Sequence, residues 1–240
     1  MAIENWSEAE SGTFLDLGRY AVPERERQLA LIVELVGAAT AGGDVVDLCC
    51  GEGLATAALR AALPETVVQA LDGSPAMLAA TRAAAGDDLN LRTALIELED
   101  DAWRRFDAPL RAVVSSLAVH HLDDGAKRVL FRDLHGALAP GGVFVLADLV
   151  APTTIIGQRM AAAMWDDEVR RRALAMDGDE RGFRAFEAAD WNLYRQAQPD
   201  PVDRPSRLLD QLDWLRDAGF VDIELHWAMA GHVLLSGWKA

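Results

Sequence analysis

The stretch VVDLCCGEG, residues 45–53, joins a short apolar run to a glycine-containing turn and directly precedes a helical pattern at residues 54–62. Gly51 and Gly53 let the backbone approach a ligand where a Cβ atom would collide, and the start of the following helix offers unpaired N–H groups. Asp47 ends the expected strand and can accept a hydrogen bond from a ligand ammonium group, directly or through water. An ordinary structural turn has the same pattern, so the surrounding sequence decides between the two.

Strands and helices alternate on both sides of this turn. We expect helices at residues 23–40, 54–62, 127–138 and from residue 75, and strands at residues 45–48, 67–71, 89–96, 107–115 and 143–150. Several of these strands are continuously apolar, as strands covered on both faces must be. The pattern predicts an α/β fold with a doubly wound parallel sheet, whose ligand lies beyond the carboxyl ends of the strands.

The rhythm changes after residue 150. Residues 151–206 carry helical periodicity, many charges and the aromatic residues Trp165, Trp191 and Tyr194. We interpret this segment as a cap inserted over the site of a single domain spanning residues 1–240. Its aromatic residues either form a wall around a substrate or pack the cap onto the core. A helix at residues 208–218 and an antiparallel strand pair joined near residues 230–231 close the chain.

Composition limits the partners. The chain has 240 residues and a formal net charge of −15, which argues against nucleic acid and against anionic membrane surfaces. The two cysteines, Cys49 and Cys50, are adjacent, so we expect a reducing compartment and a cytoplasmic location. The acidic N-terminus lacks the apolar core of a signal peptide, and no apolar run is long enough to span a membrane.

A second acidic residue strengthens the ligand-site interpretation. Asp72 closes the next strand and is followed by Gly73. Because the ends of neighbouring parallel strands meet at one edge, its carboxylate can accept both hydroxyls of a ribose. Its structural alternative is a helix N-cap, a role that Ser74 can also fill. Met77 either lies against a purine with its thioether or is a plain core methionine.

Four motifs together resemble those of the class I S-adenosylmethionine (SAM)-dependent methyltransferases. They are DLCCGEG (47–53), LDGSPAML (71–78), VVSSLAVHHL (113–122) and LAPGGVFVLAD (138–148), in the order and spacing of that family. The resemblance implies a Rossmann-like seven-stranded sheet of order 3-2-1-4-5-7-6 and SAM as cofactor. It implies that the first turn holds the methionine part, that Asp72 holds the ribose and that Ser116 lies against the cofactor.

Two positions depart from the family pattern. Cys49 stands where the family commonly has the first of three glycines, and we interpret it as a tolerated small residue at the cofactor. The family often has a Gly-Asp pair after the third strand, whose carboxylate contacts the adenine. This chain lacks that pair, and Glu97 or Glu99 could take its place. Dinucleotide-binding oxidoreductases share the architecture, but their G-x-G-x-x-G spacing does not fit residues 49–55.

The loop after the fourth strand is expected to border the methyl group. His120 and His121 are the candidate catalytic residues, since either imidazole can act as general base near neutral pH. The alternative for each is a structural histidine that fixes the loop. Tyr20 either closes over the cofactor or anchors the N-terminal segment in the core. We predict no metal site, because no third ligand lies near the histidines in the sequence.

The sequence therefore predicts a methyltransferase that acts on a small-molecule acceptor, without nucleic acid or membrane as partner. Two alternatives stay open. One is an enzyme similar to carboxy-SAM synthase, which modifies the cofactor itself, and the other is a SAM-binding protein without catalysis. The sequence also leaves open whether the chain works alone or as a homodimer.

Overall fold

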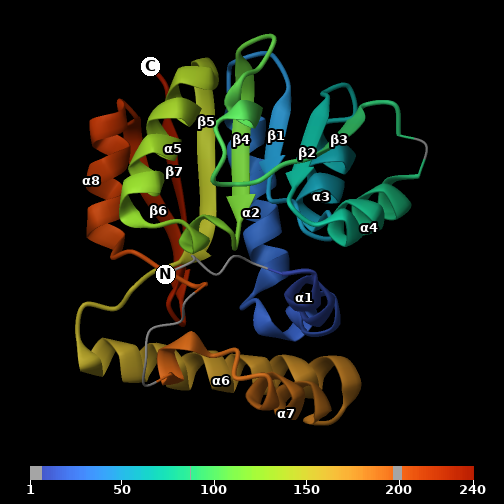
Figure 1. The fold of residues 1–240 in the computed structure, drawn as a ribbon, viewed down its shortest axis with the longest axis vertical. Coiled ribbons are helices and arrows are strands. Elements are labelled where there is room, and N and C mark those ends of the chain that lie inside the picture. The colour runs from blue at the N-terminus through green and yellow to red at the C-terminus, as the bar shows by residue number, and fades with distance from the viewer. Residues whose placement is uncertain (1–6, 87, 197–201) are drawn as a thin grey trace.

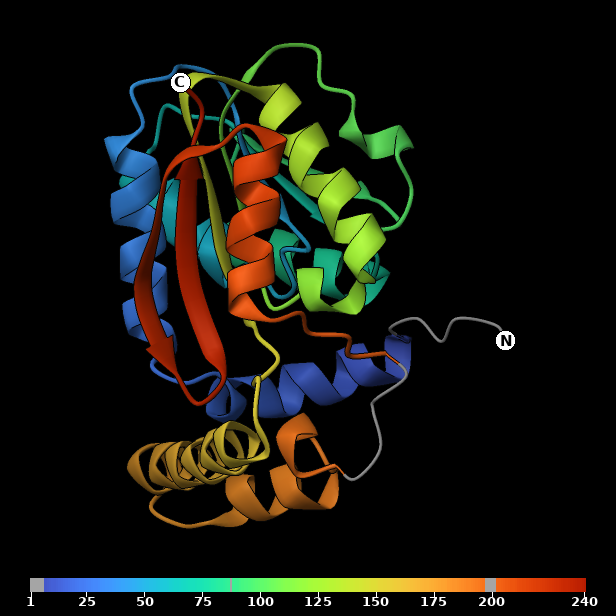
Figure 2. The same ribbon diagram turned by 90° about the vertical axis from the view of Figure 1, so that its left-hand side faces the viewer.

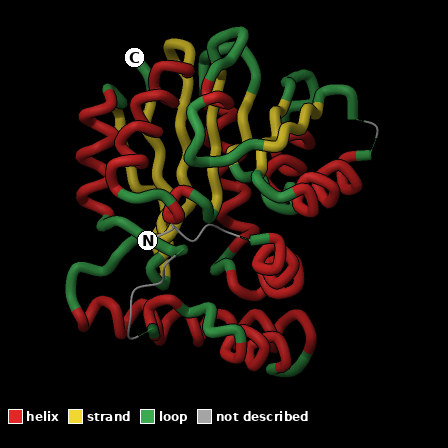
Figure 3. The backbone as a smooth tube through the Cα atoms, in the orientation of Figure 1, coloured by secondary structure: helices red, strands yellow, loops and turns green. Residues whose placement is uncertain are grey.

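The computed structural model describes residues 7–86, 88–196 and 202–240. Its seven strands are β1 (Val45–Leu48), β2 (Val68–Asp72), β3 (Leu91–Leu95), β4 (Leu110–Ser116), β5 (Leu138–Leu149), β6 (Val221–Met229) and β7 (His232–Trp238). They form one sheet in the order β3-β2-β1-β4-β5-β7-β6 (Figures 1 and 3). The first five strands are parallel, and β7 is antiparallel to both β5 and β6. This confirms the predicted fold class and strand order.

The helices alternate with these strands much as the sequence predicts. They are α1 (Glu8–Ala21), α2 (Arg25–Ala38), α3 (Leu54–Ala62), α4 (Pro75–Ala85), α5 (Asp124–Ala137), α6 (Ile155–Asp177), α7 (Arg181–Ala188) and α8 (Leu208–Ala218), with short 3-10 turns η1 (Ala102–Arg104), η2 (Val119–His121) and η3 (Leu193–Arg195). The start of β5 differs from the expected residue 143, because Leu138 already pairs with Leu110 before a bulge carries the chain to Val143.

Buried side chains on both faces of the central strands hold two helix layers. Val45 of β1 packs in one cluster with Ile32 and Val36 of α2. The next residue, Val46, packs in another cluster with Leu130 of α5. Because successive strand side chains point to opposite faces, a strand covered by helices on both sides must be apolar at every position. This two-sided core fixes the carboxyl ends of β1, β2 and β4 side by side.

The N-terminal helix α1 is an element that the sequence analysis did not predict. A capping box begins it: the Glu10 backbone N–H donates to Ser7 Oγ (3.3 Å), and the Ser7 backbone N–H donates to Glu10 Oε2 (2.6 Å). The Ser-x-x-Glu spacing is the sequence signal for this start. Helix α1 lies between the lower edge of the sheet and the pair α6–α7, as the two perpendicular views in Figures 1 and 2 show.

The helical periodicity predicted for residues 151–206 is confirmed by α6, α7 and η3, whereas residues 202–206 form neither helix nor strand; residues 197–201 of that prediction lie outside the described residues. It packs chiefly on α1. The Trp165 indole Nε1–H donates to the carbonyl of Ala21 (2.7 Å), and the Arg172 guanidinium donates to the carbonyl of Arg19 and to Glu26. The three aromatic residues of the prediction join this packing cluster, and Trp165 and Trp191 also line a cavity described below.

Candidate active site

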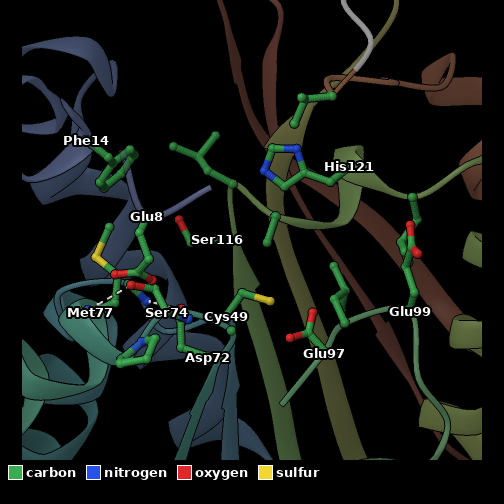
Figure 4. A pocket seen from close by; sticks show the side chains of 18 of the residues that line it. Glu8, Phe14, Cys49, Asp72, Ser74, Met77, Glu97, Glu99, Ser116 and His121 are labelled. Carbon is green, nitrogen blue, oxygen red and sulfur yellow. Dashed lines mark hydrogen bonds between the residues drawn. The ribbon is translucent and has the colours of Figure 1, made fainter. Parts of the chain in front are cut away.

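A cavity of about 310 Å³ opens at the carboxyl ends of β1, β2 and β4. Seven of the residues predicted to bind the cofactor or to catalyse line it: Cys49, Gly51, Asp72, Gly73, Met77, Ser116 and His121. Figure 4 shows five of them, Cys49, Asp72, Met77, Ser116 and His121. Glu97 and Glu99, the candidates for the adenine end, lie on its wall after β3. Glu8 and Phe14 of α1 complete it from the side that the sequence analysis left undefined. The predicted edge of the sheet therefore carries a cavity.

Asp72 organises the turn around this cavity. Its Oδ2 accepts a hydrogen bond from the backbone N–H of Gly51 (2.8 Å), and its Oδ1 accepts one from Ser74 (2.8 Å). Burial raises the pKa of Asp72, although the backbone N–H groups around it lower the pKa in turn. Ser74 in turn caps α4, because its Oγ accepts from the Met77 N–H (3.1 Å). Asp72 thus ties β1 to β2 and still lines the cavity.

The two glycines of the first turn have different roles. A Cβ atom added to Gly51 would meet nothing within 4 Å, because that side of the residue faces open space. A Cβ atom added to Gly53 would lie 2.7 Å from Thr81 Oγ1, inside the packing of α3 on α4. Both have positive φ, 57° and 83°. Gly51 therefore leaves room for a ligand, whereas Gly53 allows close packing and does not line the cavity.

Asp47 and Tyr20, two further predicted cofactor residues, also lie away from the cavity lining. Asp47 is 1% exposed and its Oδ2 accepts a hydrogen bond from the Thr56 hydroxyl (2.6 Å); burial raises its pKa to about 6. The Tyr20 hydroxyl donates to Asp177, and a Cβ atom on Gly182 would lie 2.8 Å from the Tyr20 ring. Tyr20 thus takes the anchoring alternative, joining α1 to α6 and α7.

Cys49 adopts a backbone conformation that glycine enters more easily than other residues. Its φ is +56°, in the left-handed region that residues with a Cβ atom rarely enter. Burial raises the pKa of its thiol well above the usual range, and the nearby carboxylates add to the effect. Cys49 is therefore a neutral thiol on the cavity wall.

A second cavity of about 250 Å³ adjoins the first. The two share the side chains of Phe14, Leu117, His121 and Val202 as a common wall. The second cavity extends from η2 toward α1, α6 and the turn between β6 and β7. An arrangement of two adjoining cavities can hold two ligands with their reacting ends at the shared wall.

The two candidate histidines meet two carboxylates between these cavities. His120 Nδ1 lies 2.5 Å from Asp148 Oδ1, and its Nε2 lies 3.4 Å from Asp203 Oδ1. Burial opposes the charged form of His120, but the two carboxylates outweigh it and raise the pKa of His120 to about 10. His121 Nδ1 lies 3.1 Å from the same oxygen of Asp203. Burial, followed by the charge of His120, lowers the pKa of His121 below its ordinary value.

His120 and His121 therefore differ in charge at neutral pH, although they are adjacent. Buried His120 carries a proton between two carboxylates, whereas His121 is neutral and lines both cavities. Asp203 supplies the third ligand atom that the sequence lacked: with both histidines it forms a group whose ligand atoms lie within 4.8 Å of one another. Within this group, charged His120 pairs with Asp203, and neutral His121 contacts the same carboxylate oxygen.

Asp203 belongs to a short strap, residues 202–206, that the sequence analysis did not single out. The backbone N–H of Arg204 donates to the His120 carbonyl (2.8 Å). The Lys127 ammonium, fully buried, donates to the carbonyl of Arg204 (2.5 Å) and to Ser206 Oγ (2.7 Å). This anchoring holds Val202 and Arg204 against the first cavity. No local pattern marks the strap, since its partners come from α5 and η2.

His232 is another site residue that sequence reasoning missed. It is 2% exposed, lines the second cavity and stacks edge-on against Trp165, with ring centroids 4.7 Å apart. Its Nδ1–H donates to the Ala230 carbonyl (3.0 Å). Burial lowers the pKa of His232 to about 4, so the ring is neutral. Its Nε2 has no hydrogen-bond partner among the described residues.

Comparison with known proteins agrees with this geometry. Residues 45–142 match a family model described as a methyltransferase domain. A trans-aconitate 2-methyltransferase of Methylobacterium radiotolerans is 35% identical over 122 residues, which cover 49% of this chain and 44% of that protein. The chain thus spans less than half the length of the curated relative it matches.

Solved structures share the fold at low identity. An O-methyltransferase family protein from Burkholderia thailandensis has a TM-score of 0.64 at 15% identity, over 97% of this chain and 59% of that one. Human N-acetylserotonin methyltransferase in complex with SAM has a TM-score of 0.59 at 15% identity, over 98% and 57%. The DhpI–SAM–HEP complex has a TM-score of 0.57 at 19% identity, over 95% and 96%. In the described part of this chain, no helix is both long and apolar enough to cross a membrane.

Proposed function

Because the chain has the fold of the class I SAM-dependent methyltransferases and carries a methyltransferase domain in residues 45–142, we propose that it binds SAM and transfers the methyl group to a small-molecule acceptor. The observation that carries this proposal is the pair of adjoining cavities with His121 on their common wall. SAM occupies the first cavity, and the acceptor occupies the second.

The lining of the first cavity fits the parts of SAM. Asp72 accepts the ribose hydroxyls, and the open side of Gly51 makes room for the methionine part beside Cys49. Met77 flanks the adenine, while Ser116 borders the sulfonium. Asp47, Gly53 and Tyr20 act behind this surface: they hold the turn and α1 in place.

Bound SAM supplies an electrophilic methyl group, so the chain's own residues need only orient the acceptor and remove a proton. His121 is the residue placed for the second task, since it is neutral at physiological pH and lines both cavities. Asp203 holds the His121 ring by its Nδ1, and His120 fixes Asp203 in turn. His120 therefore acts as a positioning residue, and His121 receives the proton from an acceptor hydroxyl or amine.

A calorimetric titration tests the cofactor half of the proposal. We expect the protein to bind SAM and not NAD, and the Asp72→Asn variant to bind SAM at least tenfold more weakly. Asp217→Asn is the matched control, because it removes the same charge from an exposed position of α8. Thermal unfolding of each variant reports whether the fold is intact. A folded wild-type protein that fails to bind SAM would overturn the proposal.

Mass spectrometry tests the reaction. Incubation with SAM and a panel of small acceptors should yield S-adenosylhomocysteine together with a methylated acceptor. That acceptor is heavier by the mass of one CH₂ group, about 14 mass units. Incubation with SAM and prephenate separates the alternative of cofactor modification, which would instead give a heavier cofactor. If that product forms and no methylated acceptor is found, the transfer reaction proposed here is wrong.

A further inference from the structure

The second cavity has an unbalanced charge. Three carboxylates line it: Glu10 of α1, Asp190 after α7, and Asp203 of the strap. No lysine or arginine is among the described residues that line it. His120 is charged, but Asp148 and Asp203 already pair with it. An anionic ligand would therefore lose its water shell without gaining a cationic partner, which is costly in a partly buried site.

The walls of the same cavity are aromatic. Phe14 and Trp191 lie with ring centroids 5.9 Å apart. The only donor of the Trp165 indole is occupied by the carbonyl of Ala21, so Trp165 offers the cavity an apolar surface. Faces and edges of this kind pack against a flat apolar ligand. The Arg25 guanidinium already lies over the Phe14 ring, 5.5 Å from its centroid, so the π faces that can attract a ligand cation are those of the two tryptophans.

One residue that lines the cavity, His232, has a buried polar atom without a hydrogen-bond partner among the described residues. The Nδ1–H of His232 donates to the Ala230 carbonyl, which fixes Nε2 as a hydrogen-bond acceptor in the neutral ring. This Nε2 is buried and has no partner among the described residues. A buried acceptor without a partner is unfavourable. A ligand O–H or N–H group satisfies it, whereas a carboxylate, which only accepts, does not.

If the second cavity holds the acceptor, as the proposed function states, these observations identify a substrate class. We propose that the methyl acceptor is an aromatic molecule, uncharged or cationic, with an O–H or N–H group that donates to His232. The curated relative is named for trans-aconitate, a tricarboxylate, and the second cavity of this chain has the wrong charge for such an acceptor. The chain thus shares part of its sequence with that enzyme and differs in substrate class.

Three matched phenols test the charge preference. Tyramine is cationic, tyrosol is uncharged and 4-hydroxyphenylacetate is anionic, on the same phenol ring. Each is titrated into the protein saturated with S-adenosylhomocysteine, with quenching of tryptophan fluorescence as the readout. We expect tyramine and tyrosol to bind at least tenfold more tightly than 4-hydroxyphenylacetate and than trans-aconitate. Equal or tighter binding of either anion, or no binding of tyramine and tyrosol at millimolar concentration, overturns the proposal.

Two variants connect the preference to named residues. Asp190→Asn removes one cavity carboxylate, and asparagine tolerates the φ of +50° found there. We expect it to narrow the preference for tyramine over 4-hydroxyphenylacetate. Asp167→Asn is the control, since its side chain is 78% exposed on α6 outside the second cavity. An equal change in both variants would mean that the charge of the whole chain, and not the cavity, sets the preference.

The second variant tests the hydrogen bond. His232→Phe keeps a ring against Trp165 and removes the acceptor nitrogen, so tyrosol should bind roughly five- to tenfold more weakly, the effect of about one hydrogen bond. His232→Gln keeps an acceptor and should restore part of this loss. Unchanged tyrosol affinity in His232→Phe would exclude the assigned role. SAM affinity, measured in every variant, separates the two proposals: if SAM binds and the anions are preferred, only the acceptor assignment fails.

Discussion

The assignment of the general base leads to a pH dependence that separates His121 from His120. His121 has a pKa below its ordinary value, because burial and the charge of His120 both disfavour its protonated form. His120 has a pKa raised to about 10, because the carboxylates of Asp148 and Asp203 outweigh its burial. A base works only when unprotonated. If His121 is the base, the rate should therefore increase with pH up to about 6.5, as His121 loses its proton. It should then be constant from about pH 7 to 9.

The assay is the initial rate of S-adenosylhomocysteine formation between pH 5 and 10.5, at saturating SAM. Two phenols of different acidity serve as acceptors. A part of the pH–rate profile that reflects ionisation of the acceptor should shift when the phenol is changed, whereas a part that reflects ionisation of the enzyme should stay at the same pH. We expect His121→Gln to lower kcat by roughly 10²- to 10⁴-fold, the usual contribution of a general base. The acid limb should disappear with it.

Asp203→Asn provides a second readout that a merely structural role would not move. The Asp203 carboxylate raises the pKa of His121 through the contact at Nδ1. Its neutralisation should shift the acid limb of the rate profile to lower pH. The reasoning is refuted if the wild-type rate keeps climbing with an apparent pKa near 10 and this limb survives in His121→Gln. That result would make His120 the base.

Three further predictions follow from the packing. Gly51→Ala should weaken SAM binding more than tenfold, because its Cβ would enter the ligand space; both Gly51→Ala and Gly53→Ala should lower stability through their positive φ, and Gly53→Ala should lower it more, because its Cβ meets Thr81 at 2.7 Å; calorimetry and urea unfolding separate the two effects. Lys127→Met should lower the free energy of unfolding by about 1–3 kcal/mol, since it leaves buried acceptors of the strap unpaired; no change in urea unfolding would contradict this. The raised pKa of His120 means that its charged form stabilises the fold fully below pH 6.5 and less as pH rises toward 10; urea midpoints should fall across that window, and Asp148→Asn should flatten the fall.

Most of the first cavity could be predicted from the sequence, because the turns after parallel strands of one sheet build it, whereas its α1 wall could not. The turn after β1, the end of β2 and the end of β4 are adjacent in any sheet of this strand order, so motif spacing suffices to bring Gly51, Asp72 and Ser116 together. The same spacing does not tell which side of a turn faces the ligand. Asp47 and Gly53 match the motif equally well, yet their side of the turn is closed by Thr56 and Thr81.

The second cavity could not be predicted, because its walls come from elements with no sequence relation to one another. Phe14 lies on the N-terminal helix α1, whose capping box the sequence analysis did not identify. Trp165 lies on α6 of the cap segment. His232 comes from the first position of β7, near the end of the sequence. The local sequence around each of these side chains is typical of a core residue. Only the tertiary packing places all three around the same cavity. The proposed substrate class therefore depends on the part of the fold that motifs describe least.

The two histidines show why residue type alone does not assign a catalytic role. In the sequence, His120 and His121 are neighbours with the same ordinary pKa. In η2, the backbone turns far enough in one residue that His120 meets Asp148 of the adjoining strand, whereas His121 reaches the shared wall of both cavities. Asp203 then arrives from a distant strap that is itself tied to the His120 carbonyl through Arg204. Because this strap brings one carboxylate to both rings, it stabilises a proton on the ring that already has a carboxylate. The positive charge of protonated His120 disfavours a proton on His121. His121, which lines both cavities, therefore stays neutral and can accept a proton.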